Sequence, residues 1–129
     1  MNDSGLAVSA ILQETDIPLQ DIIVLVDDIH LDMGRIRIRR RGSDGGHNGL
    51  RSILSFVGSD DFPRLRLGVG RPDRDFELID HVLSDFDPDE MKVIEKSIRT
   101  AADAVTCWCS ESIEEVMNRY NAWRDNPEG

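Results

Sequence analysis

Five consecutive apolar residues, Ile-Ile-Val-Leu-Val at 22–26, constrain the fold of this chain more than any other feature. The run is rich in β-branched residues and has no polar face, which predicts a strand covered on both sides by helices in the interior of an α/β sheet. Asp27 and Asp28 follow at its C-terminal end, where open α/β sheets bind ligands. We give equal weight to a ligand-binding role for these carboxylates and to simple polar termination of the strand.

Two further segments alternate arginine with apolar residues and predict two strands. Residues 35–40 read Arg-Ile-Arg-Ile-Arg-Arg, and residues 64–70 read Arg-Leu-Arg-Leu-Gly-Val-Gly. Because side chains alternate between the faces of a strand, each segment presents arginine on one face and Ile, Leu or Val on the other. We expect the two arginine strands to share one surface.

The charge of the chain is segregated along its length. The net charge is −10, yet residues 34–74 hold ten arginines and four aspartates, a local net of +6 that leaves −16 on the remainder. A basic face on an acidic body concentrates an anionic partner at one place and repels it elsewhere, which favours specific nucleic-acid binding. The alternative is an arginine face that contacts only solvent.

A glycine-rich turn connects the first arginine strand to a predicted helix. Residues 42–53 read Gly-Ser-Asp-Gly-Gly-His-Asn-Gly-Leu-Arg-Ser-Ile, and apolar residues at helical spacing extend the helix from about His47 to Val57. Glycine allows positive φ and close approach to a ligand, while a helix N-terminus attracts anions. A phosphate ligand is the first hypothesis, and an ordinary strand-to-helix turn is the alternative.

Apolar residues at helical spacing predict three more helices. The first is capped by Ser4 and ends before Asp16, the second opens at Asp87 and runs to about Cys109, and the last begins at about Ser112; residues 71–86 predict loop and short elements. The apolar positions are Leu6, Ala7, Ala10 and Ile11 in the first helix, Met91, Ile94, Ile98, Ala101, Ala102 and Val105 in the second, and Ile113, Val116, Met117, Tyr120 and Trp123 in the last.

The length of 129 residues predicts one domain, 1–129. With neither an apolar stretch long enough to cross a bilayer nor a secretory signal pattern, we expect a cytoplasmic protein that does not contact a membrane. Cys107 and Cys109 lie two apart in a predicted helix, where their side chains diverge and cannot form an unstrained disulfide. We interpret them as packing residues and expect no metal site.

Three motifs in this order resemble those of bacterial-type peptidyl-tRNA hydrolases: Met-Asn-x-Ser-Gly at 1–5, Gly-Gly-His-Asn-Gly-Leu at 45–50, and Phe-Pro-Arg-Leu-Arg-Leu-Gly-Val-Gly-Arg-Pro at 62–72. The resemblance covers the whole chain. It implies a three-layer α/β/α fold with a mixed sheet, of which this chain supplies the later part and lacks the N-terminal strands. It also implies an enzyme that hydrolyses the ester between a peptide and the 3′ ribose of tRNA, without metal or organic cofactor, and a monomer in the full-length family.

The resemblance assigns roles to five residues. Asn2 corresponds to a substrate-binding asparagine, and Asn48 to the asparagine that holds the 3′ end of the substrate; an amide suits both because it donates and accepts without adding charge. Asp27 corresponds to the aspartate that orients the catalytic histidine. Arg39 and Arg66 match basic positions that clamp a tRNA phosphate, in keeping with their predicted outward direction.

The turn itself is assigned support. His47 matches a second histidine of the family's motif, so the resemblance gives it, with Gly45 and Gly46, the task of positioning the loop. His81 lies in an uninformative segment. For the histidines of this chain we favour a hydrogen-bonded, non-catalytic imidazole.

The sequence departs from the family pattern before the first motif. The family begins with a strand, a Gly-Asn-Pro-Gly turn and a Thr-Arg-His-Asn segment that supplies the catalytic histidine, and none of these occurs here. We therefore expect an N-terminally truncated chain in which Asp27 has no catalytic partner and which is inactive as given. His30 stands where the family usually has another aspartate; a substitute role as general base is the less favoured hypothesis.

Two alternatives to a truncated hydrolase stay open: a tRNA- or RNA-binding module without chemistry, and a non-functional gene fragment. Missing N-terminal strands would leave a sheet edge unpaired. Since an uncovered edge promotes association, we expect the fragment alone to be marginally stable or to self-associate.

Overall fold

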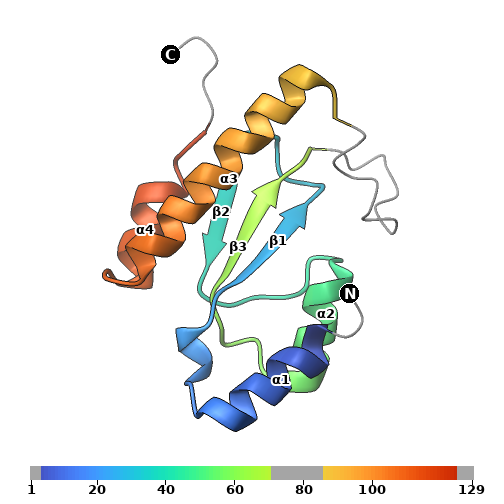
Figure 1. The fold of residues 1–129 in the computed structure, drawn as a ribbon, viewed down its shortest axis with the longest axis vertical. Coiled ribbons are helices and arrows are strands. Elements are labelled where there is room, and N and C mark those ends of the chain that lie inside the picture. Colours follow the sequence, from blue (N-terminus) through green and yellow to red (C-terminus); the bar gives the residue numbers. More distant parts are fainter. Residues whose placement is uncertain (1–3, 71–85, 125–129) are drawn as a thin grey trace. The chain divides into compact units, whose positions relative to one another are not determined.

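A computed structural model of the chain describes residues 4–70 and 86–124 (Figure 1). In chain order the elements are α1 (Ser4–Thr15), the 3-10 turn η1 (Leu19–Asp21), β1 (Val24–Asp28), β2 (Ile36–Arg39), α2 (Asn48–Val57), β3 (Arg64–Gly68), α3 (Pro88–Trp108) and α4 (Ile113–Tyr120). The predicted loop at 71–86 lies outside the described residues except for Phe86.

The three strands form one sheet in the order β1-β3-β2. Figure 1 shows β1 and β3 running in the same direction and β2 in the opposite one, so the sheet is mixed. The α/β class and the mixed sheet are therefore confirmed. Within the described residues β1 and β2 are the outer strands.

Strand β1 differs from its prediction in place and in burial. It begins at Val24, two residues later than expected, and includes Asp27 and Asp28. Val26 is buried, but Leu25 is 52% exposed. Successive side chains of a strand face opposite ways, and here one of the two faces is open at Leu25. The prediction of a strand covered on both sides is wrong for the described part of the chain.

The described residues form two compact units. The first comprises residues 4–26 and 38–65, and the second comprises residues 27–37, 66–70 and 86–124. The prediction of one domain over 1–129 stays a prediction.

In the first unit, α1 packs on α2 beside the start of β1. The buried residues Val26, Leu50, Ile53 and Phe62 form its core, with partly buried apolar residues of both helices around them. Helix α2 begins and ends as predicted: His47 is its N-cap, and Gly58 is its C-cap in the left-handed conformation.

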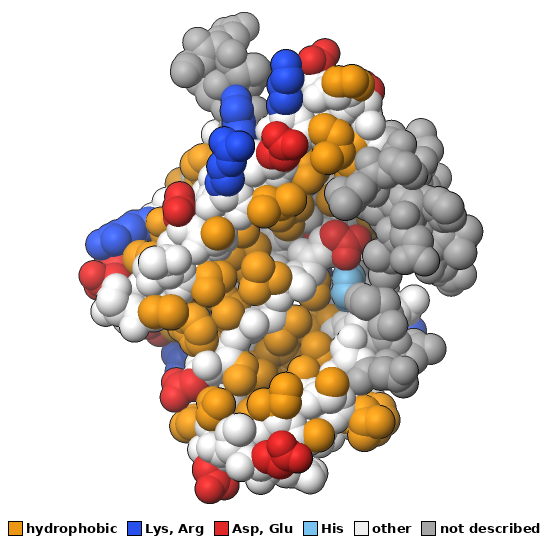
Figure 2. Space-filling view, in the orientation of Figure 1, with side chains coloured by type: hydrophobic (Ala, Val, Ile, Leu, Met, Phe, Trp, Pro, Cys, Tyr) orange, Lys and Arg blue, Asp and Glu red, His pale blue; other side chains and the backbone are white. Residues whose placement is uncertain are grey.

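Helix α1 lies with a different face inward from the one predicted. Leu6, Ala7, Ala10 and Ile11 are all exposed, and Gly5 is the buried residue of the helix. Figure 2 shows hydrophobic side chains at the surface in the region where Figure 1 draws α1. A Cβ at Gly5 would overlap the carbonyl oxygen of Ser52. The close approach of α1 to α2 at this glycine therefore decides which face is buried, and the apolar pattern does not.

In the second unit, α3 covers an apolar core of Val69, Phe86 and Ile94, which Leu67 of β3 and Met91 also contact. Helix α3 opens with a capping box in which Asp87 accepts from Glu90 N at 2.8 Å and Glu90 accepts from Asp87 N at 3.1 Å, and helix α4 is capped by Ser112. Both helix starts are confirmed.

The buried stripe of α3 consists of Ile94, Ser97, Ala101 and Ala104. Ile98 and Ala102, which were expected inside, are exposed: each directly follows a buried residue, Ser97 or Ala101, and therefore lies about 100° around the helix from it. Of the apolar residues expected inside α4, Val116 is fully buried and the others are half-buried. Both cysteines are free thiols; Cys107 is half-buried, but Cys109 is exposed and is not the packing residue we expected.

Candidate functional site

The turn between β2 and α2 is closed by its own hydrogen bonds. Gly45 and Gly46 have φ of 57° and 84°, left-handed values that favour glycine. The side chain of Asp44 accepts from Gly46 N at 2.7 Å, and the Asp44 carbonyl accepts from His47 N at 2.9 Å. The prediction that the glycines allow a left-handed turn is confirmed, and Asp44 is a contributor that sequence reasoning missed.

His47 caps helix α2 with its side chain. Its Nδ1 accepts from Leu50 N at 3.1 Å, and its carbonyl accepts from Arg51 N at 2.9 Å. An imidazole that accepts at Nδ1 carries its hydrogen at Nε2, so this bond selects one tautomer. In that tautomer His47 can donate at Nε2, and protonation of Nδ1 would break the cap.

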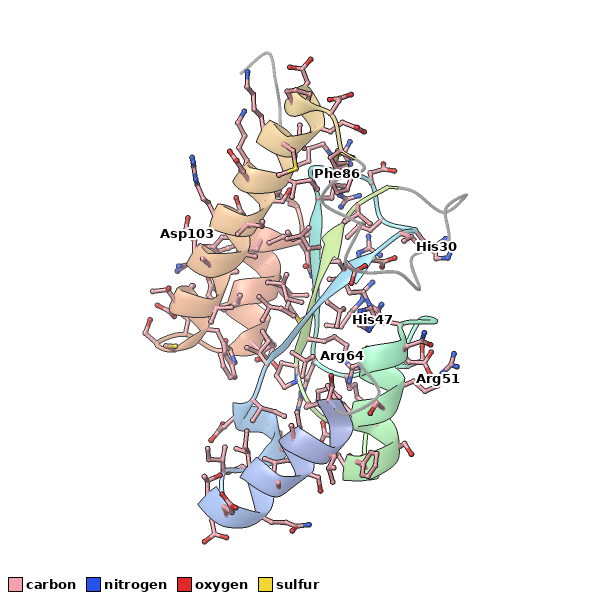
Figure 3. The ribbon with its side chains drawn as sticks, turned by 45° about the vertical axis from the view of Figure 1, so that its right-hand side comes forward. His30, His47, Arg51, Arg64, Phe86 and Asp103 are labelled. Carbon is pink, nitrogen blue, oxygen red and sulfur yellow. The ribbon has the colours of Figure 1, made fainter. Side chains whose placement is uncertain are left out.

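Asn48 is the first residue of α2 and is exposed, while the next two residues, Gly49 and Leu50, are buried. Because these neighbours are buried, the first turn of the helix is held in place. The Asn48 amide projects from this turn into solvent. On the same turn Arg51 Nε lies 3.4 Å from Asp44 Oδ2. Figure 3 shows His47 and Arg51 at the start of α2.

Arg39 ends β2 and is exposed, whereas Ile36 and Ile38 of the same strand are fully buried. The predicted alternation is therefore confirmed in β2. In the described part of the chain no ion pair involves Arg39. As far as the described residues are concerned, its guanidinium can bind an anion without losing a carboxylate partner.

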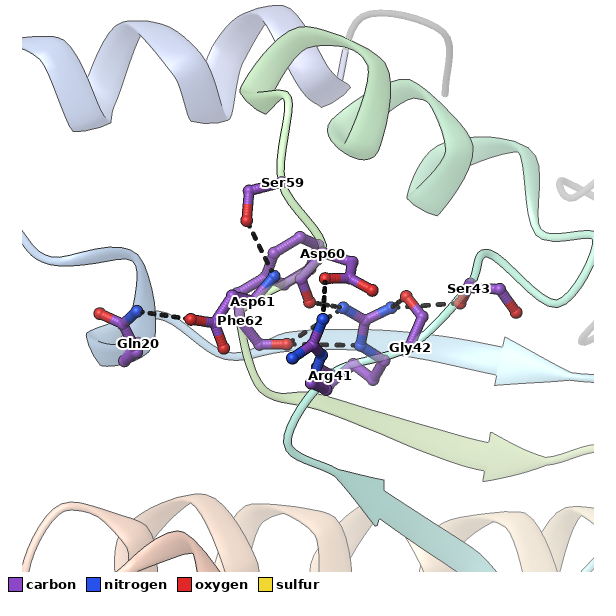
Figure 4. A network of polar contacts seen from close by, with 9 residues as sticks. Gln20, Arg41, Gly42, Ser43, Ser59, Asp60, Asp61 and Phe62 are labelled. Carbon is purple, nitrogen blue, oxygen red and sulfur yellow. Dashed lines mark hydrogen bonds and ion pairs between the residues drawn. The ribbon is translucent and has the colours of Figure 1, made fainter.

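Arg64 was expected on the exposed arginine surface, and this prediction is wrong. The residue is fully buried, and its Cζ lies 4.4 Å from the centroid of the Phe62 ring. Nη1 donates to the carbonyls of Gly42 at 2.6 Å and Ser43 at 3.1 Å, and Nη2 donates to those of Asp60 at 2.7 Å and Phe62 at 3.1 Å (Figure 4). The residue opens β3 where two loops present carbonyl groups, and buried charge is tolerated when its donors are satisfied.

In the second unit, Arg66 forms an ion pair with Asp28. Arg66 Nη1 lies 3.8 Å from Asp28 Oδ2, and the two side chains are only 13% and 18% exposed. The predicted outward direction of Arg66 is therefore wrong. Its side chain pairs with a carboxylate of β1 and is mostly buried. Asp28 Oδ1 also accepts from His30 N at 2.8 Å, while the His30 side chain is exposed.

Asp27 precedes this pair in β1 and is half-buried. It belongs to the second unit with Arg66, whereas Arg39, His47 and Asn48 belong to the first. Asn2 and His81 lie outside the described residues. Among the described residues, no group of three His, Cys, Asp or Glu side chains is placed to hold a metal ion.

None of the described helices combines the length and the apolar character that crossing a bilayer demands.

Comparison with known proteins gives a consistent result. A family model described as peptidyl-tRNA hydrolase matches residues 1–128. Among similar curated proteins, the peptidyl-tRNA hydrolase of Desulforudis audaxviator is 45% identical over 124 residues, 96% of this chain and 62% of that protein. That of Synechococcus sp. (strain JA-2-3B'a(2-13)) is 45% identical over 121 residues, 94% of this chain and 54% of that protein.

Solved structures similar to this chain are also peptidyl-tRNA hydrolases. The crystal structure of peptidyl-tRNA hydrolase from Acinetobacter baumannii superposes with a TM-score of 0.84 at 31% identity, covering 96% of this chain and 63% of that one. A peptidyl-tRNA hydrolase in complex with N-propanol gives a TM-score of 0.85 at 30% identity. The chain spans between about half and two thirds of the length of these relatives. By its sequence and its fold, this chain belongs to the peptidyl-tRNA hydrolase family.

Proposed function

We propose that the chain takes part in the hydrolysis of peptidyl-tRNA, cleaving the ester between the peptide and the 3′ ribose. Asn48 binds the 3′ end of the substrate, Arg39 and Arg66 contact tRNA phosphates, and Asp27 orients the imidazole of a catalytic histidine. Asn2, outside the described residues, is a further substrate contact. The partner is tRNA in the cytoplasm.

The observation that carries this proposal is the anchored turn that presents Asn48. Asp44 closes the turn, His47 caps the helix that follows it, and Arg64 bonds to the carbonyl of Gly42 before it, so the backbone that carries Asn48 has few conformations to lose when a ligand binds. One amide group can donate to an ester carbonyl or accept from a ribose hydroxyl. An uncharged amide on an ordered backbone suits recognition of a nucleotide 3′ end.

The chemistry requires a water molecule to attack the ester carbonyl while a base takes its proton, after which the protonated base gives a proton to the 3′ oxygen as it leaves as a hydroxyl. Asp27 can accept from one ring nitrogen of an imidazole and so keep the other nitrogen basic. His47 does not fit the part of the base, because its Nδ1 already accepts from Leu50 N and its Nε2 carries the hydrogen. We therefore assign His47 to support of the turn.

Binding tests the recognition half of the proposal. The ligand is a tRNA acceptor-stem minihelix whose 3′ end carries an N-acetyl-aminoacyl group through a non-hydrolysable amide. Fluorescence anisotropy between 50 and 200 mM salt would show Arg39→Ala weakening the complex and reducing the salt slope by about 1. Arg99→Ala is the matched control, since Arg99 is an exposed arginine of α3 outside the motifs. Equal effects of the two substitutions would contradict the role of Arg39.

Release of labelled peptide from peptidyl-tRNA tests the hydrolytic half. Any turnover by the chain should be abolished by Asp27→Asn while the affinity for the minihelix is kept, because the carboxylate acts through an imidazole and does not hold RNA. Tight minihelix binding with no turnover at any enzyme concentration would contradict hydrolysis by this chain and would match the expectation that Asp27 has no catalytic histidine partner here.

A further inference from the structure

Arg64 has a complete set of acceptors around its guanidinium. A guanidinium carries five N–H donors, and five hydrogen bonds are made: two by Nη1, two by Nη2, and one by Nε to the Phe62 carbonyl at 3.4 Å. The acceptors are four backbone carbonyls on two segments that are about twenty residues apart in sequence, 42–43 and 60–62. One buried side chain therefore ties two loops together.

One of these two segments leads directly into the turn that presents Asn48. Gly42 and Ser43 are followed by Asp44, whose side chain and carbonyl close the turn before His47. The hydrogen bonds from Arg64 to the carbonyls of Gly42 and Ser43 fix the residues before this turn, and the cap at His47 fixes the residue at its end. Between those two fixed points the backbone has little freedom, although both glycines there have left-handed φ.

We propose that Arg64 is a positioning residue for Asn48: it holds the carbonyls of Gly42 and Ser43 and thereby sets the geometry of the turn that binds the 3′ end. The functional part rests on the proposed role of Asn48. The mechanical part, the ordering of the turn by Arg64, does not. Arg64 does not touch the substrate, because it is fully buried.

The neighbouring Arg41 supplies a matched control. Its Nη2 lies 3.3 Å from the Asp60 side chain, and both side chains are well exposed. Arg41→Ala therefore removes one arginine from the same region without touching a carbonyl of the turn. Surface pairs of this kind contribute little to stability.

Lysine is an informative replacement at position 64. It keeps the charge but offers three donors at one nitrogen in place of five on a planar fork, so it cannot reach carbonyls of both loops in the same geometry. We expect Arg64→Lys to stay folded with a loosened turn, and Arg64→Gln to loosen it further. Phe62→Leu, which removes the ring beside the guanidinium but keeps an apolar side chain, is a second variant if position 64 tolerates no change.

Amide hydrogen exchange of the full chain tests the mechanical part. In Arg64→Lys, exchange of the amides of residues 46–51 should rise about tenfold or more over wild type, while the amides of α3 keep their protection and Arg41→Ala changes neither. Unchanged exchange at residues 46–51 in a folded Arg64→Lys or Arg64→Gln variant would overturn the proposal.

Ligand discrimination tests the functional part with two minihelices, one ending in the N-acetyl-aminoacyl amide and one lacking the single-stranded 3′ end. Wild type should prefer the first, Arg39→Ala should weaken both equally, and Arg64→Lys should reduce the ratio of their dissociation constants several-fold. If Arg64→Lys raises amide exchange at residues 46–51 but leaves the ratio of the two dissociation constants unchanged, the positioning of Asn48 by Arg64 is refuted. A wild-type chain without any preference would instead contradict the proposed function and leave the exchange result standing.

Discussion

Replacement of Gly5 by alanine tests the packing of the first unit most directly. A Cβ at this position would overlap the carbonyl oxygen of Ser52 and lie 2.8 Å from Cδ2 of Phe56. Gly5 N also donates to Ser52 Oγ at 3.0 Å. Alanine can be accommodated only if α1 moves away from α2.

Two effects of opposite sign decide the outcome. Alanine is favoured over glycine by about 0.5–1 kcal/mol in a helix interior, and by less in the first turn, where Gly5 lies. Overpacking a tight contact costs about 1–3 kcal/mol, and loss of the hydrogen bond to Ser52 adds about 0.5–1.5 kcal/mol. We therefore expect Gly5→Ala to lower the free energy of unfolding by about 1–3 kcal/mol, so that packing outweighs propensity.

Urea unfolding, followed by circular dichroism and by tryptophan fluorescence, measures this difference. With a slope of about 2 kcal/mol per molar urea, the midpoint should fall by about 0.5–1.5 M. Ala10→Gly, at an exposed position of the same helix, is the control and should cost only the propensity difference of about 1 kcal/mol. A midpoint for Gly5→Ala at or above that of wild type would refute the close helix contact.

Substitutions at two other positions test the helix cap at His47 and the ion pair of Asp28 with Arg66. His47→Ala should lower the free energy of unfolding by about 1 kcal/mol through loss of the cap on Leu50 N, and His47→Asn should recover most of it; equal losses in urea titrations of both variants would exclude capping. Asp28→Asn keeps an oxygen for His30 N but removes the charge beside Arg66, so affinity for the minihelix should rise roughly a few-fold at about 0.1 M salt, and an unchanged affinity would count against a phosphate contact by Arg66.

The turn before α2 could be predicted in detail because its determinants are local. A glycine pair allows left-handed backbone, and a polar residue before the apolar period marks the helix start, so the position of His47 and Asn48 follows from neighbours in the sequence. The starts of α3 and α4 were predictable for the same reason, since Asp87 and Ser112 bond to amides three residues on.

The direction of individual side chains was less predictable because it depends on distant segments. Arg64 and Arg66 lie two residues apart in β3, a spacing that predicts the same face of the strand. In the structure the first donates to carbonyls of two loops and the second pairs with Asp28. Helix α1 has an apolar stripe that the sequence predicts to be buried, but Gly5 allows a closer approach on another face. The spacing of apolar residues along the sequence locates neither the loop carbonyls nor the partner helix.

These differences change what the basic segment can do. Its local net charge of +6 suggested a broad anion-binding face, but Arg64 acts inside the fold and Arg66 is paired with Asp28. Arg41 and Arg51 each lie within 3.4 Å of an aspartate oxygen. Exposed arginines that lose a carboxylate partner on binding gain less from a phosphate, because the new attraction replaces an old one. Few phosphates can therefore be neutralised at full strength, with Arg39 the foremost candidate in the described chain. This favours recognition that depends on the Asn48 turn over recognition by charge alone.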